Sequence, residues 1–112
     1  MRILVVDDEQ IVRETVAGVL RDMGHEVVLA ESAEAAFELS KRSTFDALIT
    51  DMQMPGESGL FLIEELVARE KCPKKVVLMT ANTLPPRAKQ KLCLLSKPFS
   101  LQDLERFLEE TE

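Results

Sequence analysis

Five short apolar runs, spread along the chain, constrain its fold more than any other feature of the sequence. They occupy residues 3–6, 27–30, 47–49, 76–79 and 92–95. Each is rich in valine, isoleucine or leucine and lacks the polar alternation of a strand with one face in water. Parallel strands that are covered by helices on both faces have this composition. The runs therefore predict five buried strands.

Helical patterns fill most of the gaps between these runs. Gly24 follows the first pattern and suits the left-handed conformation found at helix C-termini. Ser32, Ser58 and Ser100 are placed to cap later helices through their hydroxyl groups. We expect apolar stripes that comprise Ile11, Val12, Thr15, Val16, Val19, Leu20 and Met23 in the first helix, Ala36, Phe37 and Leu39 in the second, Leu60, Ile63, Leu66 and Val67 in the third, and Leu101, Leu104, Phe107 and Leu108 in the last.

The fourth crossover differs from the others because Pro85 and Pro86 interrupt it. Proline lacks a backbone N–H and disfavours a helical conformation in the residue before it, so only residues 87–91 are left for a helix. We expect the fourth helix to be short or missing. The alternation of strands and helices still predicts an α/β fold, a doubly wound five-stranded parallel sheet with helices on both faces. Ligands of such folds bind beyond the carboxyl ends of the strands.

Length and charge narrow the classes of function. A chain of 112 residues with 46% hydrophobic content suffices for one core and is short for two, so we expect one domain over residues 1–112. The net charge of −6 argues against direct nucleic-acid binding, which needs clustered lysine and arginine.

The first apolar run is too short for a signal peptide or a membrane span. Cys72 and Cys93 lack a C-x-x-C spacing and indicate a reducing compartment, for which we expect the cytoplasm.

Polar residues capable of chemistry follow four of the predicted strands. Asp7 and Asp8 follow the first, Asp51 the third, Thr80 the fourth, and Lys97 lies just past the fifth. These residues can converge on one crevice, because ligand sites of this fold lie at the carboxyl ends of the strands. Three carboxylates gathered there would repel one another, and a bound cation would relieve the repulsion. Mg²⁺ fits best, since it prefers oxygen ligands and binds through carboxylates together with phosphate oxygens.

Four motifs occur in order along the chain. They are Val5-Val6-Asp7-Asp8-Glu9, Asp51-Met52-Gln53-Met54-Pro55 followed by Gly59, Thr80-Ala81, and Lys97-Pro98-Phe99. Together they resemble the receiver domains of bacterial two-component response regulators, and the resemblance covers essentially the whole chain. We accordingly expect a flavodoxin-like strand order, 2-1-3-4-5.

The resemblance also implies a metal site. Asp8 and Asp51 would ligate Mg²⁺ directly, and Asp7 would hold it mainly through water. Gln53 would contribute its backbone carbonyl. This ligand set suits a hard cation, since every donor is an oxygen.

The resemblance further implies that Asp51 accepts a phosphoryl group from a sensor histidine kinase or a phosphotransfer protein. Thr80 would hydrogen-bond a phosphoryl oxygen, and Lys97 would pair first with the Asp51 carboxylate and then with the phosphoryl group. Catalysis would consist mostly of positioning and electrostatics, and the chain would act on itself rather than turn over a separate substrate. The phosphorylated form would switch contacts with an output domain or a target protein.

Two features depart from the receiver pattern. The stretch from Thr80 to Lys97 is shorter than usual by about one helical turn, and Leu94 stands where receivers usually carry an aromatic residue. They leave open an alternative, a receiver-like interaction module that is not phosphorylated. Phosphatases of the haloacid-dehalogenase type also form an aspartyl-phosphate, but they need a second acid where this chain has Gln53.

Overall fold

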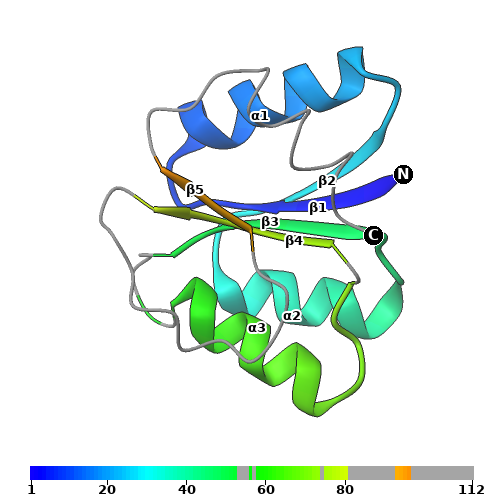
Figure 1. Cartoon of the computed structure of the whole chain (residues 1–112), viewed down its shortest axis with the longest axis vertical. Helices are drawn as coiled ribbons and strands as arrows, with labels where there is room; N and C mark the ends of the chain where they lie inside the picture. The colour runs from blue at the N-terminus through cyan, green and yellow to red at the C-terminus, as the bar shows by residue number, and fades with distance from the viewer. Residues whose placement is uncertain (53–55, 57, 74, 81–92, 97–112) are drawn as a thin grey trace.

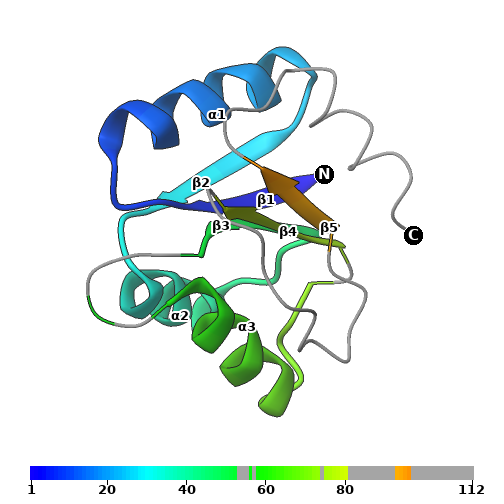
Figure 2. The ribbon, with the colours of Figure 1, turned by 60° about the vertical axis from the view of Figure 1, so that its left-hand side comes forward.

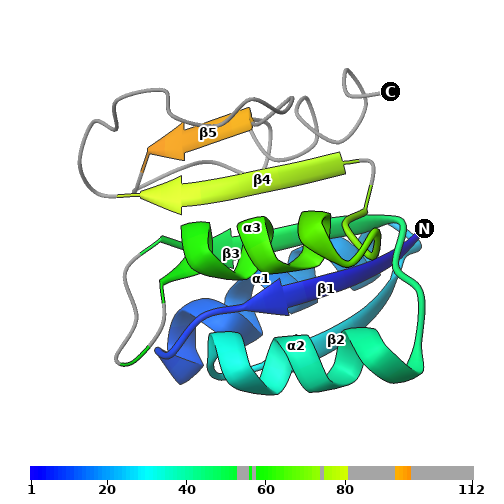
Figure 3. The same cartoon turned by 90° about the horizontal axis from the view of Figure 1, so that it is seen from below.

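The computed structural model describes residues 1–52, 56, 58–73, 75–80 and 93–96. The described strands form one parallel sheet in the order β2-β1-β3-β4-β5 (Figure 3). They are β1 (Arg2–Val6), β2 (Glu26–Ala30), β3 (Ala47–Asp51), β4 (Lys75–Thr80) and β5 (Cys93–Ser96). This is the strand order expected from the sequence.

Three helices lie in the described part of the chain: α1 (Gln10–Asp22), α2 (Ala33–Arg42) and α3 (Gly59–Ala68). Helix α1 covers one face of the sheet, and α2 and α3 lie side by side on the other (Figures 1 and 2). The predicted doubly wound α/β fold is confirmed. The fourth helix and the helix after Ser100 fall on residues 81–92 and 97–112, which lie outside the described residues. Among the described helices, none has the length and apolar character to cross a membrane.

The pairing of the strands brings their carboxyl ends to one side of the molecule. Val6 of β1 is aligned with Thr50 of β3, and Asp51 of β3 is aligned with Met79 of β4. Thr80 is the next residue of β4 after Met79 and ends that strand. The residues that follow β1 and those that end β3 and β4 therefore lie at the same end of the sheet, which we call its carboxyl end.

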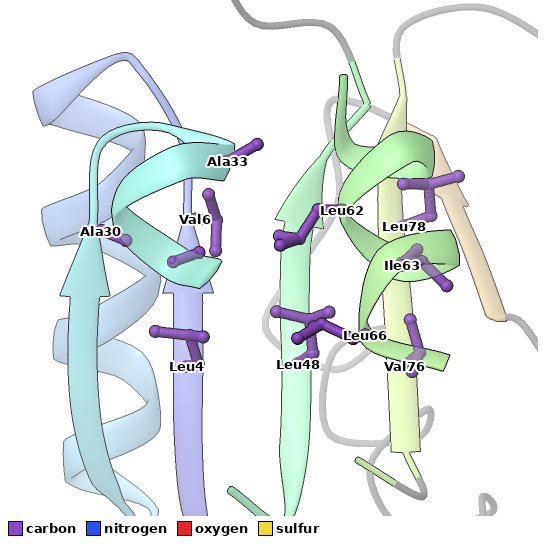
Figure 4. Close-up of a cluster of buried hydrophobic side chains, with 11 residues drawn as sticks. Leu4, Val6, Ala30, Ala33, Leu48, Leu62, Ile63, Leu66, Val76 and Leu78 are labelled. Carbon is purple, nitrogen blue, oxygen red and sulfur yellow. The ribbon is translucent and has the colours of Figure 1, made fainter. Parts of the chain in front are cut away.

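The core consists of two apolar clusters, one on each face of the sheet, because neighbouring side chains of a strand point to opposite faces. The cluster beneath α1 includes Ile3, Val5, Val16, Ala17, Leu20, Ile49 and Val77. The cluster beneath α2 and α3 includes Leu4, Val6, Leu48, Leu62, Ile63, Leu66 and Leu78 (Figure 4).

The predicted helix caps are present where the structure describes them. The Ser32 hydroxyl accepts a hydrogen bond from the Ala35 N–H at 3.0 Å, and the Ser58 hydroxyl accepts one from the Phe61 N–H at 3.1 Å. Gly24 has a φ of +93°, in the left-handed region. These caps set where α2 and α3 begin and how the chain leaves α1.

Two predicted apolar stripes were partly wrong. Ile11 is 81% exposed and Thr15 is exposed, whereas Ala17, which the prediction left out, is buried. Ile11 precedes the buried Leu20 by nine residues, which is about two and a half helical turns and places it on the opposite side of α1. In α3 the buried stripe contains Leu62, and Val67 is 37% exposed.

Candidate functional site

Three carboxylates meet at the carboxyl end of the sheet. Asp7 and Asp8 follow β1, Asp51 ends β3, and one oxygen of each lies within 4.8 Å of the others. Asp7 is fully buried and Asp51 is 7% exposed, while Asp8 is exposed. The structure thus brings together the three acids that the sequence placed at strand ends. Because Asp8 is exposed, the cluster of three carboxylates is accessible from solvent.

The chemistry of this cluster fits a metal ion. Like charges at this separation repel, and burial of Asp7 and Asp51 weakens the screening by water. A divalent cation bound between the carboxylates would offset the repulsion. The three donors are oxygens, so the cluster suits a hard cation rather than one that needs sulfur or nitrogen ligands.

Hydrogen bonds of the turn between β1 and α1 position Asp7. Its N–H donates to the Ala30 carbonyl at 3.2 Å, and its carboxylate Oδ1 accepts from the Glu9 N–H at 2.9 Å. Arg13 of α1 donates from Nη1 to the Asp7 carbonyl at 2.8 Å. Sequence reasoning missed Arg13, although it is the one basic residue in the first two turns of this helix. It anchors the acidic turn to α1.

Asp51 is held by the strand that carries it and by the start of α3. The N–H of Met52 donates to the Met79 carbonyl at 2.9 Å, which continues the pairing with β4 beyond Asp51. The N–H of Gly59 then donates to the Met52 carbonyl at 3.0 Å. A Cβ on Gly59 would overlap the Asp51 carbonyl oxygen. Only glycine allows the first turn of α3 to lie this close to the strand.

The other predicted site residues are placed only in part. Thr80 ends β4, the strand next to β3, so its backbone lies at the carboxyl end of the sheet. Leu94 lies in β5 and is aligned with Leu78 of β4. Gln53 and Lys97 lie outside the described residues.

Two described side chains with shifted pKa values lie away from the carboxylates. Burial lowers the pKa of His25, and the N-terminal ammonium group and Lys75 lower it further. Burial raises the pKa of the Cys72 thiol, which favours its protonated form. His25 precedes β2 and Cys72 precedes β4, so both lie at the opposite end of the sheet from the acidic cluster.

Comparisons with known proteins agree with this arrangement. Residues 3–109 match the family described as response regulator receiver domain. The chain is 33% identical over 109 residues to the transcriptional regulatory protein PdtaR of Mycobacterium tuberculosis, covering 92% of this chain and 52% of PdtaR. It is 30% identical over 118 residues to the sensor histidine kinase AruS of Pseudomonas aeruginosa, covering 98% of this chain and 12% of AruS. The chain therefore spans about half or less of the length of these curated relatives.

A protein of similar fold has been solved together with bound ligands. The response regulator TrrA of Thermotoga maritima, solved in complex with Mg²⁺ and BeF, superposes with a TM-score of 0.86 at 31% identity. The match covers 97% of this chain and 96% of TrrA.

Proposed function

Because the chain belongs to the family of response regulator receiver domains, which are phosphoacceptors in two-component signal transduction, we propose that Asp51 is the residue that becomes phosphorylated. The observation that carries this proposal is the meeting of Asp7, Asp8 and Asp51 within 4.8 Å at the ends of β1 and β3. Of the three, Asp51 alone lies on a central strand, flanked by β1 and β4. That strand holds the carboxylate in a fixed place while the phosphoryl donor approaches.

The proposed cofactor is Mg²⁺. Asp8 and Asp51 would bind it directly, Asp7 mainly through water, and Gln53 through its backbone carbonyl. When bound, Mg²⁺ would neutralise charge on the phosphoryl oxygens during transfer. The TrrA complex supports this choice of metal, because that protein was solved with Mg²⁺ and BeF.

The proposed reaction is the transfer of a phosphoryl group from a phosphohistidine. A carboxylate oxygen of Asp51 attacks phosphorus, the new O–P bond forms as the N–P bond breaks, and the imidazole keeps the electron pair and takes up a proton from water. Thr80 would donate a hydrogen bond to a phosphoryl oxygen, and Lys97 would pair with the phosphoryl group. These contacts would stabilise the active conformation of the domain.

The proposed partners act before and after this phosphoryl transfer. A sensor histidine kinase or a phosphotransfer protein in the cytoplasm would supply the phosphoryl group, and an output domain or a target protein would read the switch. Sequence similarity to AruS and PdtaR, a kinase and a regulator, supports such partners. Residues 1–112 would form the receiver domain in either a stand-alone or a longer regulator.

Phosphorylation of the purified protein tests this function. The wild type is incubated with Mg²⁺ and acetyl phosphate, and intact mass is measured for it, for Asp51→Asn and for Asp22→Asn, a control at an exposed carboxylate that ends α1. We expect one phosphoryl group on the wild type and on Asp22→Asn, none on Asp51→Asn, and none on the wild type when EDTA is present. An equal gain of mass in wild type and Asp51→Asn would remove Asp51 from the mechanism. Failure of the wild type to gain phosphate would favour the receiver-like interaction module.

A further inference from the structure

The residue before Asp51 is a buried threonine in an apolar row. Thr50 is 0% exposed and is aligned with Val6 of β1 and Leu78 of β4. By strand alternation it points to the same face as Leu48, toward α2 and α3. Figure 4 shows Val6, Leu48 and Leu78 on that face. A hydroxyl group at this position is therefore surrounded mainly by hydrocarbon.

The Thr50 hydroxyl is satisfied by the phosphoacceptor itself. It donates a hydrogen bond to the backbone carbonyl of Asp51 at 3.0 Å. A buried hydroxyl without a partner is destabilising, so this bond defines the orientation of the hydroxyl and restrains that of the carbonyl. A threonine side chain suits the task because branching at Cβ restricts its rotation.

Gly59 restrains the same carbonyl from the side of α3. A Cβ at Gly59 would overlap the Asp51 carbonyl oxygen and would lie 3.0 Å from the Thr50 Oγ1. The carbonyl is therefore enclosed between the Thr50 hydroxyl and the first residue of α3. Rotation of the peptide group that follows Asp51 would break the hydrogen bond to Thr50 or press the oxygen against Gly59.

We propose that Thr50 is a positioning residue for the phosphoacceptor. Its hydroxyl fixes the peptide group after Asp51 from the face of α3, while the Asp51 side chain reaches Asp7 and Asp8 from the face of α1. The direction of the carboxylate depends on the backbone that carries it, and a small misplacement of a reacting group slows a reaction considerably. The proposal rests on the proposed function, in which Asp51 is the nucleophile.

Two substitutions at Thr50 distinguish the effect of its hydroxyl group from the effect of its side-chain shape. Thr50→Val keeps the branched shape and removes the hydroxyl, whereas Thr50→Ser keeps the hydroxyl. Ser40→Ala removes another buried hydroxyl, on α2, and Val76→Ala makes a small cavity in the same core cluster. For each variant we would measure the phosphorylation rate as a function of acetyl phosphate at saturating Mg²⁺, together with the unfolding midpoint.

We expect Thr50→Val to lower the phosphorylation rate at saturating donor by about tenfold, with the donor concentration for half-maximal rate unchanged. Thr50→Ser should restore the rate to within about twofold of the wild type, since it keeps the hydrogen bond. Ser40→Ala and Val76→Ala should keep the wild-type rate, even though Val76→Ala lowers the unfolding midpoint. A wild-type rate for Thr50→Val, or equal losses for Thr50→Val and Thr50→Ser, would overturn the proposal.

A spectroscopic measurement keeps this test separate from that of phosphorylation. The ¹³C chemical shift of the Asp51 carbonyl reports the hydrogen bond directly, and it should move upfield in Thr50→Val and stay near the wild-type value in Thr50→Ser. If the wild type takes up no phosphate, the proposed function fails. An unchanged Asp51 carbonyl shift in Thr50→Val overturns the role of Thr50 whether or not phosphate is taken up.

Discussion

At the amino end of the sheet, where the strands begin, opposite charges lie next to each other, whereas at the carboxyl end three carboxylates gather. The Arg2 Nε lies 3.2 Å from the Glu26 Oε2 in the neighbouring strand, and the backbone N–H of Arg2 donates a hydrogen bond to the Asp46 carboxylate at 2.8 Å. The acids at the carboxyl end come within 4.8 Å of one another. At the amino end an ion pair within the chain offsets part of the charge, whereas at the carboxyl end a bound cation would offset the charge of the three carboxylates. Four predictions test this contrast.

Substitution of Gly59 at the carboxyl end should have the largest effect. The Cβ of Gly59→Ala would overlap the Asp51 carbonyl, so the variant should lose about 2 to 3 kcal/mol of unfolding free energy. Gly18→Ala is the matched control, because a Cβ there meets no atom within 4 Å, and it should gain about 0.5 to 1 kcal/mol as a helix-interior alanine. Urea denaturation measures both. Wild-type stability of Gly59→Ala would show that α3 does not need the close approach to Asp51.

Removal of one acid should weaken metal binding and relieve repulsion. Asp8→Asn should lower the affinity for Mg²⁺ by at least about tenfold, measured by calorimetry. In metal-free buffer the same variant should be more stable than the wild type, by more at low salt than at high salt, because like charges are screened by ions. Asp46→Asn at the amino end should leave the Mg²⁺ affinity unchanged. A loss of stability in metal-free Asp8→Asn would contradict the view that the three acids repel.

Disruption of the ion pair at the amino end should have a smaller effect. Glu26→Gln should lower the unfolding free energy by no more than about 0.5 kcal/mol, because both side chains are well exposed and solvent screens the pair. Phosphorylation and Mg²⁺ affinity should match the wild type. A change in either by several-fold would mean that the two ends of the sheet are coupled.

The smallest expected effect is a pH dependence at His25. Its pKa is lowered from the usual 6.5 in the folded chain, chiefly by burial, so below pH 6.5 the unfolded chain takes up the proton more readily. The stability of the wild type relative to His25→Gln should therefore be constant above this pH and should decrease as the pH falls toward 5. Urea midpoints of the two proteins between pH 7.5 and 5 measure the difference. If the wild type instead became more stable relative to His25→Gln as the pH falls, a lowered pKa of His25 could not be the cause.

The strands and helix caps could be predicted because their signals are local. An unbroken apolar run indicates a doubly covered strand, and the Ser32 and Ser58 hydroxyls act on N–H groups three residues away. The side of a helix that faces the sheet, in contrast, is not determined by neighbouring residues alone. Whether Ile11 or Ala17 faces the sheet depends on how the whole of α1 is rotated above the strands, and the sequence stripe included the wrong one of the two.

The candidate site was predictable to the extent that strand ends determine it. The rule that ligands bind at the carboxyl ends of parallel strands was sufficient to bring Asp7, Asp8 and Asp51 together. The contacts that support them were not predictable, because the hydrogen bond of Arg13 to the Asp7 carbonyl and that of Thr50 to the Asp51 carbonyl depend on three-dimensional packing. Thr50 also belongs to a strand that extends two residues beyond its apolar run.

The order of the strands has a consequence for the nascent chain. Asp51 is synthesised before β4, and β3 pairs with β1 on one side and with β4 on the other. Until the ribosome has delivered that later strand, the carbonyl of Met79 is not there to receive the Met52 N–H beside Asp51. The growing polypeptide therefore contains Asp51 before the contacts with β4 that position it can form.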